Sequence, residues 1–135
     1  MEIAQIEEAE FPQIIDGQSF VPLLLNEGLE LAPRPLFWHY PNEWGPEGPG
    51  IGSYSAVRLG DWKLIYFHKD LSLELYNLKD DLQESNNLLD SNRKRAQELS
   101  EILTMHLQSV EAQMPSDKIM GELVPWPNNL LDSKE

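Results

Sequence analysis

The sequence predicts an α+β domain, in which an antiparallel sheet of about four strands carries one amphipathic helix across a face. Residues 36–40 alternate in strand fashion, and so do the two runs that flank Gly60-Asp61, a dipeptide suited to a two-residue hairpin turn. A later stretch, 92–113, spaces its apolar residues three and four apart, which is typical of one face of a helix. Hydrophobic residues make up 41% of the 135 positions, enough for a globular core.

The chain divides by composition into a leading segment, 1–33, a central domain, 34–115, and an extended tail, 116–135. Within the leading segment, Asp16-Gly17 indicates a turn, and Ser19 is placed to cap a short helix over 20–25. This segment has no Lys or Arg, and it carries seven acids: Glu2, Glu7, Glu8, Glu10, Asp16, Glu27 and Glu30. We expect it to face solvent or a partner.

The strands follow in order along the central domain. Prolines bracket the first, Leu36–Tyr40, so it should start and stop abruptly. The hairpin comprises Tyr54–Leu59 and Asp61–His68, and Ser72–Leu78 follows it closely. Short connections between successive strands favour an antiparallel meander.

The helix is expected over 92–113, with Asp90 or Ser91 as its cap and Pro115 as its stop. Its apolar stripe consists of Leu99, Ile102, Leu103, Leu107 and Val110. After it, Trp126 stands between two prolines, which predicts an extended tail.

Charge excludes two classes of partner. The chain has 23 acids against 10 Lys and Arg, for a formal net charge of −13. Nucleic acids and anionic membrane surfaces both require clustered cations, so neither is expected as a partner. The absence of cysteine excludes disulfides, thiolate metal sites and thiol nucleophiles.

Several motifs occur in a fixed order over residues 14–115. They are Asp16-Gly17-Gln18-Ser19-Phe20-Val21-Pro22-Leu23-Leu24, Arg34-Pro35-Leu36-Phe37-Trp38-His39-Tyr40-Pro41, Gly60-Asp61-Trp62-Lys63-Leu64 within 55–65, and Glu74-Leu75-Tyr76-Asn77-Leu78. Asp81, Glu84 and Asn87-Leu88 follow. In this order the chain resembles the C-terminal subdomain of the formylglycine-dependent sulfatases, in the arylsulfatase-like form common among bacterial polysaccharide-degrading enzymes.

The resemblance implies a parent enzyme, a sulfuric ester hydrolase. Its large N-terminal α/β domain would hold the formylglycine, a divalent cation (usually calcium) and the sulfate pocket, and the C-terminal subdomain would close one side of that pocket. The chain lacks the Cys/Ser-x-Pro-x-Arg element and the family's metal-binding Asp residues, so we expect no catalytic residue, metal ligand or cofactor in it.

The same resemblance implies the partners and the location. Alone, the chain should be inactive, as a truncated form of such an enzyme. Its partners would be the missing N-terminal domain and, in the full enzyme, a sulfated carbohydrate, and family members of this type are usually periplasmic or extracellular. An apolar surface meant for the missing domain could make the isolated chain self-associate.

Three residues are candidates for contact with substrate. The imidazole of His39 could donate to a sulfate or a sugar hydroxyl, Asn42 could bind a hydroxyl, and Trp44 could stack on a sugar ring. Each has a structural alternative. His39 could be a strand histidine hydrogen-bonded to the backbone, Asn42 a solvated loop residue, and Trp44 a tryptophan that packs on the protein itself. Arg58 is expected to pair with Glu74 or Asp61, and the acids at 80, 81 and 84 are interpreted as turn residues because no glycine among them suits a calcium loop.

Two other functions compete with the sulfatase interpretation. The acidic leading segment and the lack of catalytic residues also suit a free-standing interaction module, which should be a monomer with a polar surface on every face. A weak carbohydrate-binding module would instead use Trp44 and Trp126.

Overall fold

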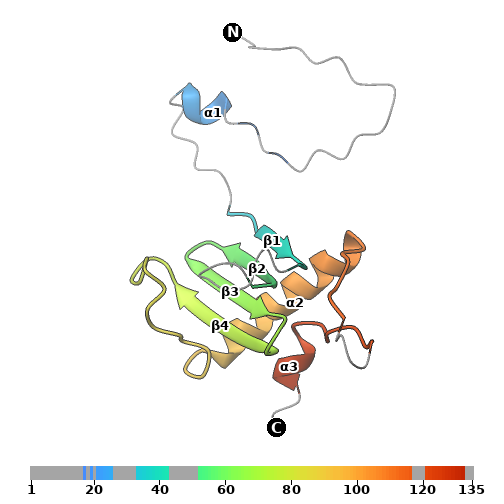
Figure 1. Cartoon of the computed structure of the whole chain (residues 1–135). Coiled ribbons are helices and arrows are strands. Elements are labelled where there is room, and N and C mark those ends of the chain that lie inside the picture. The colour runs from blue at the N-terminus through green and yellow to red at the C-terminus, as the bar shows by residue number, and fades with distance from the viewer. Residues whose placement is uncertain are drawn as a thin grey trace, which may run out of the picture. The chain divides into compact units, whose positions relative to one another are not determined.

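The computed structural model describes residues 17, 19, 21–25, 33–42, 52–116 and 121–132 (Figure 1). The chain divides into two compact units, 1–32 and 33–135. In the described part of the first unit, α1 (Val21–Leu24) forms where the short helix was predicted, and the Val21 N–H donates to Ser19 Oγ at 3.3 Å. The seven acids of the leading segment lie outside the described residues.

The second unit contains the predicted antiparallel meander. Its strands are β1 (Leu36–Tyr40), β2 (Tyr54–Leu59), β3 (Trp62–Phe67) and β4 (Ser72–Asn77), in the spatial order β1-β2-β3-β4. Leu59 lies opposite Trp62, which leaves Gly60-Asp61 as a two-residue turn. Gly60 has φ of 62° and Asp61 has no positive φ, the pattern of a type II′ turn.

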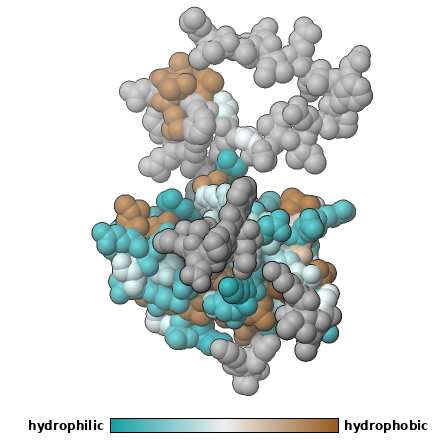
Figure 2. All heavy atoms as spheres, viewed as in Figure 1, coloured by the Kyte–Doolittle hydropathy of each residue, from teal (hydrophilic) through white to brown (hydrophobic). Residues whose placement is uncertain are grey.

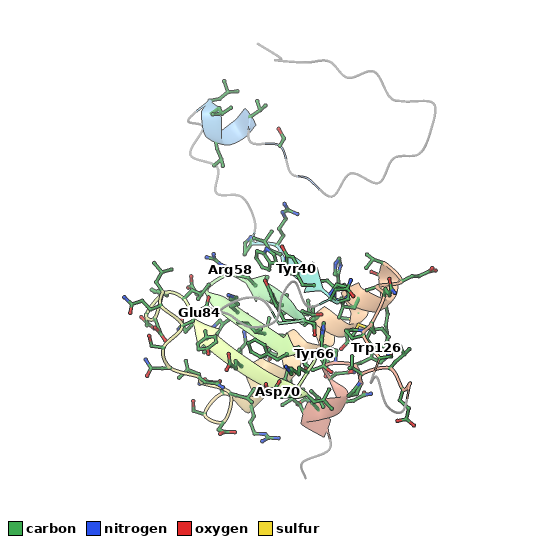
Figure 3. All side chains as sticks on the ribbon, in the orientation of Figure 1. Tyr40, Arg58, Tyr66, Asp70, Glu84 and Trp126 are labelled. Atoms are coloured by element: carbon green, nitrogen blue, oxygen red, sulfur yellow. The ribbon has the colours of Figure 1, made fainter. Side chains whose placement is uncertain are left out.

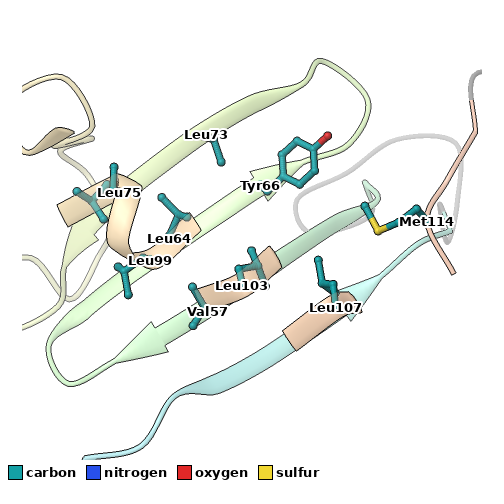
Figure 4. Close-up of a cluster of buried hydrophobic side chains, with 10 residues drawn as sticks. Val57, Leu64, Tyr66, Leu73, Leu75, Leu99, Leu103, Leu107 and Met114 are labelled. Carbon is teal, nitrogen blue, oxygen red and sulfur yellow. The ribbon is translucent and has the colours of Figure 1, made fainter. Parts of the chain in front are cut away.

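One face of this sheet is covered by α2 (Arg93–Ser109), and the main core lies between them (Figure 4). Alternate strand residues face the helix, and residues three and four apart on the helix face the sheet. The fully buried members include Val57, Leu64, Tyr66, Leu75, Leu99, Leu103 and Leu107. The α+β fold is therefore confirmed.

The helix is shorter at its C-terminus than predicted. It ends at Ser109, because Glu111 adopts φ of 50° and two hydrogen bonds close the end: Ala112 N–H to the Leu107 carbonyl and Glu111 N–H to the Gln108 carbonyl. This is a Schellman motif with a glutamate in the left-handed position that glycine usually occupies. The predicted stop at Pro115 was therefore wrong, and Val110, assigned to the apolar stripe, is 57% exposed.

The predicted N-terminal cap of this helix was also wrong. The N-cap position is Asn92 rather than Asp90 or Ser91, and its side chain makes no capping hydrogen bond. Asn92 Nδ2 instead donates to Ser91 Oγ at 3.0 Å. Ala96 and Leu99, near the start of the helix, are both fully buried.

The tail was expected to be extended, but it folds back onto the core. Ser116 bridges Leu123, and Asn129–Asp132 form the short helix α3. Tyr66 donates its hydroxyl proton to the Pro125 carbonyl at 2.9 Å, and Trp126 packs against the main core cluster. No helix among the described residues is long and apolar enough to cross a membrane.

Replacing Tyr66 by Phe tests this docking of the tail. The change keeps the buried ring but leaves the Pro125 carbonyl without its donor, so we expect a loss of about 1 kcal/mol in the free energy of unfolding. Urea denaturation followed by circular dichroism would measure it. Tyr40→Phe is the matched control, because the Tyr40 side chain is exposed, and a loss as large there would contradict the assignment.

Candidate functional site

The candidate site residues lie where β1 ends. His39 is the penultimate residue of β1, and Asn42 is exposed in the bend just after it. Trp44, the third predicted residue, lies outside the described residues. The structure thus places His39 and Asn42 at one end of the sheet.

Both ring nitrogens of His39 are engaged within the chain. Its Nδ1 lies 2.8 Å from Ser55 Oγ, and its Nε2 lies 3.1 Å from the carbonyl oxygen of Gln113. Ser55 is the direct cross-strand neighbour of His39 in β2, and Gln113 reaches the ring because α2 has already ended at Ser109. The structural alternative for His39, a strand histidine bonded to backbone, describes this geometry.

The hydrogen bonds continue from Ser55 to His68, just beyond the end of β3. Ser55 Oγ lies 2.8 Å from His68 Nε2. A carbonyl only accepts, so His39 Nε2 carries a proton, and in neutral His39 the Nδ1 atom accepts from the Ser55 hydroxyl. Ser55 Oγ then accepts a hydrogen bond from the N–H group at His68 Nε2. His68 Nδ1 is left as a buried lone pair with no partner among the described residues.

Burial keeps His68 neutral. The residue is 3% exposed, and burial together with the nearby His39 lowers the pKa of His68 to about 4. The two rings lie 5.8 Å apart between centroids. This row of His39, Ser55 and His68 is a hydrogen-bonded support that joins β1, β2 and the end of β3.

A third histidine adjoins the row. His106 of α2 stacks on Phe37 with ring centroids 3.7 Å apart and planes within 5°. Burial, and then His39, lowers its pKa. The sequence interpretation treated the three histidines as scattered, which is wrong, since all three gather beside β1.

Sequence reasoning missed Ser55 and His68. Strand alternation places both on the helix side of the sheet, as it does His39, but the pairing register that unites them is not visible locally. Ser55 is fully buried, so its hydroxyl does not meet a substrate. The row positions the end of β1 rather than acting as a catalytic triad.

The charged residues that the sequence singled out also have different partners. Arg58 donates from Nε to the Gly60 carbonyl at 3.1 Å and makes no ion pair with Glu74 or Asp61. Glu74 accepts from the Tyr76 hydroxyl instead, at 2.9 Å. Lys63 pairs with Glu84 at 2.6 Å, and both side chains are partly buried. Arg58 and Glu84 are labelled in Figure 3.

The acids after β4 do not fit a calcium site. Asp81 Oδ2 accepts the backbone N–H groups of Ser85 and Asn86, both at 2.8 Å, and these bonds lower its pKa. Asp80 accepts from Asn77 Nδ2. In the part of the chain that the structure describes, no group of three His, Cys, Asp or Glu could hold a metal ion. Each carboxylate here serves the turn or an ion pair.

Comparison with known proteins identifies the family. Residues 1–113 match the family model described as N-sulphoglucosamine sulphohydrolase, C-terminal. The chain belongs to this family. It is thus a sulfatase C-terminal subdomain.

Individual sulfatases agree with this assignment. The chain is 31% identical over 114 residues to an N-acetylglucosamine-6-O-sulfatase of Bacteroides thetaiotaomicron, a match that covers 81% of this chain and 20% of the relative. A sulfatase of Formosa agariphila is 34% identical over 97 residues, covering 67% of this chain and 18% of the relative. The solved structure of BT4656, in complex with its substrate D-glucosamine-2-N,6-O-disulfate, superposes with a TM-score of 0.62 at 31% identity, covering 81% of this chain and 23% of that one.

This sulfatase C-terminal subdomain spans only about a fifth of the length of the relatives that it matches. The remaining four-fifths of those relatives have no counterpart in these 135 residues.

Proposed function

We propose that the chain is the non-catalytic C-terminal subdomain of a sulfatase and forms one wall of its substrate pocket. The observation that carries the proposal is the end of β1. There, hydrogen bonds through the row of His39, Ser55 and His68 tie the strand to its neighbours, and Asn42 follows as an exposed amide. A polar side chain on a supported strand end is well placed to select a substrate.

In this proposal the residues have distinct roles. The Asn42 amide can both donate to and accept from a sugar hydroxyl or a sulfate oxygen. His39 is a positioning residue, because binding a substrate directly would require it to give up Ser55 or Gln113. Trp44, two positions after Asn42, is proposed from the sequence to stack on a sugar ring.

The chemistry of hydrolysis would belong to the rest of the enzyme. In the family, a formylglycine and a calcium ion supply the nucleophile and the positive charge that stabilises the sulfate. The described residues of this chain do not fit a calcium site, so we assign them no part in either group. Their contribution is the shape and polarity of the wall. The substrate class proposed is a sulfated sugar, since BT4656 binds a disulfated glucosamine.

A chimera tests the proposal. The matching C-terminal part of the B. thetaiotaomicron N-acetylglucosamine-6-O-sulfatase would be replaced by this chain, and hydrolysis of N-acetylglucosamine 6-sulfate would be followed. We expect Asn42→Ala to raise KM by about three- to tenfold with little change in kcat, as the loss of one substrate hydrogen bond predicts.

Gln97→Ala, an exposed amide on α2, is the matched control and should leave both constants unchanged. If the chimera is active and Asn42→Ala leaves its KM unchanged, the role of this chain as a pocket wall is refuted. Hydrolysis by the 135-residue chain alone would refute the non-catalytic role.

A further inference from the structure

A line of residues, one from each strand, crosses the sheet on the side that faces α2. Its members lie opposite one another in the strand pairing, in the order His39, Ser55, Tyr66 and Leu73. All but His39 are buried. The line therefore joins the end of β1, next to Asn42, to the far edge of the sheet.

One helix is too narrow to cover this line. Neighbouring strands lie about 4.8 Å apart, so a four-stranded face is about 14 Å wide between its outer strands, whereas a helix with its side chains is about 10 Å across. α2 packs mainly on β2 and β3, and it ends at Ser109. The segment after the helix completes the cover, because the main core cluster also includes Met114, Val124, Trp126, Leu130 and Leu131. We name the described residues of 113–132 the strap.

The strap meets the line with two backbone carbonyls. The Gln113 carbonyl accepts from His39 Nε2 at 3.1 Å, and the Pro125 carbonyl accepts from the Tyr66 hydroxyl at 2.9 Å. The ring of Tyr66 in turn lies edge-on to that of His68, with centroids 5.0 Å apart. The strap thus contacts the His39 end of the row directly and the His68 end through Tyr66.

Two further contacts hold the strap in place. Within it, the Pro115 carbonyl accepts the Val124 N–H at 3.0 Å. Thr104, buried on α2, donates its hydroxyl proton to Asn128 Oδ1 at 3.2 Å and accepts the Asn128 N–H at 3.3 Å. Buried hydroxyls need partners, and those of Thr104 and Tyr66 both find theirs in the strap. With the strap in place, the brown apolar patches on the visible face of this unit are separated by teal polar ones (Figure 2).

We propose that the strap is a positioning element for the end of β1: docked, it fixes the row and with it Asn42, and released, it leaves both free to move. The family match ends at Gln113, so all but the first residue of the strap lies beyond it. Release would take the carbonyl acceptors away from His39 and Tyr66 and admit water to the row. The effect on substrate rests on the proposed function, whereas the effect on the row does not.

A released-strap variant, Trp126→Ala with Asn128→Ala, tests the proposal in the 135-residue chain. The two changes remove an aromatic side chain that packs on the core and the side-chain partner of Thr104, and they leave the row itself unaltered. NMR would follow exchange of the ring N–H protons of His39 and His68 with water. We expect exchange at least tenfold faster in the variant, because local opening exposes both rings.

The matched control is Leu123→Ala, a change in the same strap at a side chain that is 68% exposed, and it should leave exchange unchanged. Equal exchange in the released-strap variant and the wild type would overturn the proposal. If that variant does not fold, Thr104→Val is compared with Ser100→Ala, which removes a buried hydroxyl that bonds within α2 to the Gln97 carbonyl. Faster exchange in Thr104→Val alone supports the strap, and equal rates in the two variants overturn it.

Turnover of the chimera described above gives a second readout. Release of the strap should raise KM about three- to tenfold with little change in kcat, as Asn42→Ala does, and the two changes together should raise it no further. A merely structural role would lower the active fraction, and so the apparent kcat, without moving KM. A KM that responds to Asn42→Ala but not to release, or an additive rise, would overturn the positioning role.

The two proposals fail separately. Faster exchange at the row with a KM that Asn42→Ala leaves unchanged would remove the pocket wall and keep the contact of the strap with the row. Unchanged exchange with a KM raised by Asn42→Ala would keep the wall and remove the strap.

Discussion

Leu103→Ala is expected to lower the free energy of unfolding by about 3 kcal/mol, within the 2–5 kcal/mol range for such truncations. Leu103 is fully buried at the middle of α2 and belongs to the cluster that joins the helix to Val57 and Leu64 of the sheet. The substitution removes three carbons and leaves a cavity that β2 and β3 cannot close, because their backbones are held in a four-stranded sheet.

Urea denaturation of the full chain would measure this loss. Met105→Ala is the matched control, two positions along the same helix but 62% exposed, and should change stability by less than about 0.5 kcal/mol. Equal effects at the two positions would mean that α2 does not cover the sheet through Leu103.

A loss of stability on acidification is the second large expected effect. The pKa of His68 falls from 6.5 to about 4 on folding, through burial and the neighbouring His39, so between these values the unfolded chain binds the proton and the folded chain does not. Stability from this residue is complete above pH 6.5 and is lost as the pH falls through about 4. The shift corresponds to about 3 kcal/mol. His106, whose pKa is also lowered, acts in the same direction.

The measurement is the free energy of unfolding at intervals from pH 7 to pH 4. His68→Gln should flatten the slope in this window whatever its effect on absolute stability, and His106→Gln should flatten it less. An NMR titration of the His68 ring in the wild-type chain gives an independent check. A native pKa near 6.5 there would contradict a buried, neutral imidazole.

The strands were predictable because buried and exposed side chains alternate from one residue to the next along a strand. Alternation in 36–40 and 54–59 indicated which side chains share a face, and Gly60-Asp61 located the hairpin. The end of α2 was not predictable in this way. Glu111 takes a left-handed conformation that sequence reasoning assigns to glycine, and the carbonyls of Leu107 and Gln108 accept the N–H groups of Ala112 and Glu111 there.

The ion pairs show the same limit. Arg58 was matched with acids close in sequence or on the next strands, yet the loop after β4 brings Glu84 to Lys63 instead. Strand pairing alone places Arg58 opposite Leu36 and Lys63, with no acid in register. Which carboxylate a cation meets depends on the path of a loop, and local patterns do not contain that path.

By itself, the sequence determined the family and the order of the elements, because motifs and hydrophobic periods are local properties of a chain. Only the tertiary structure decided that His39, Ser55, His68 and the Gln113 carbonyl meet beside β1. These contacts join residues 13 to 74 positions apart. They exist because sheet register and the early end of α2 bring distant backbone segments within hydrogen-bonding distance, and no stretch of a few residues encodes that distance.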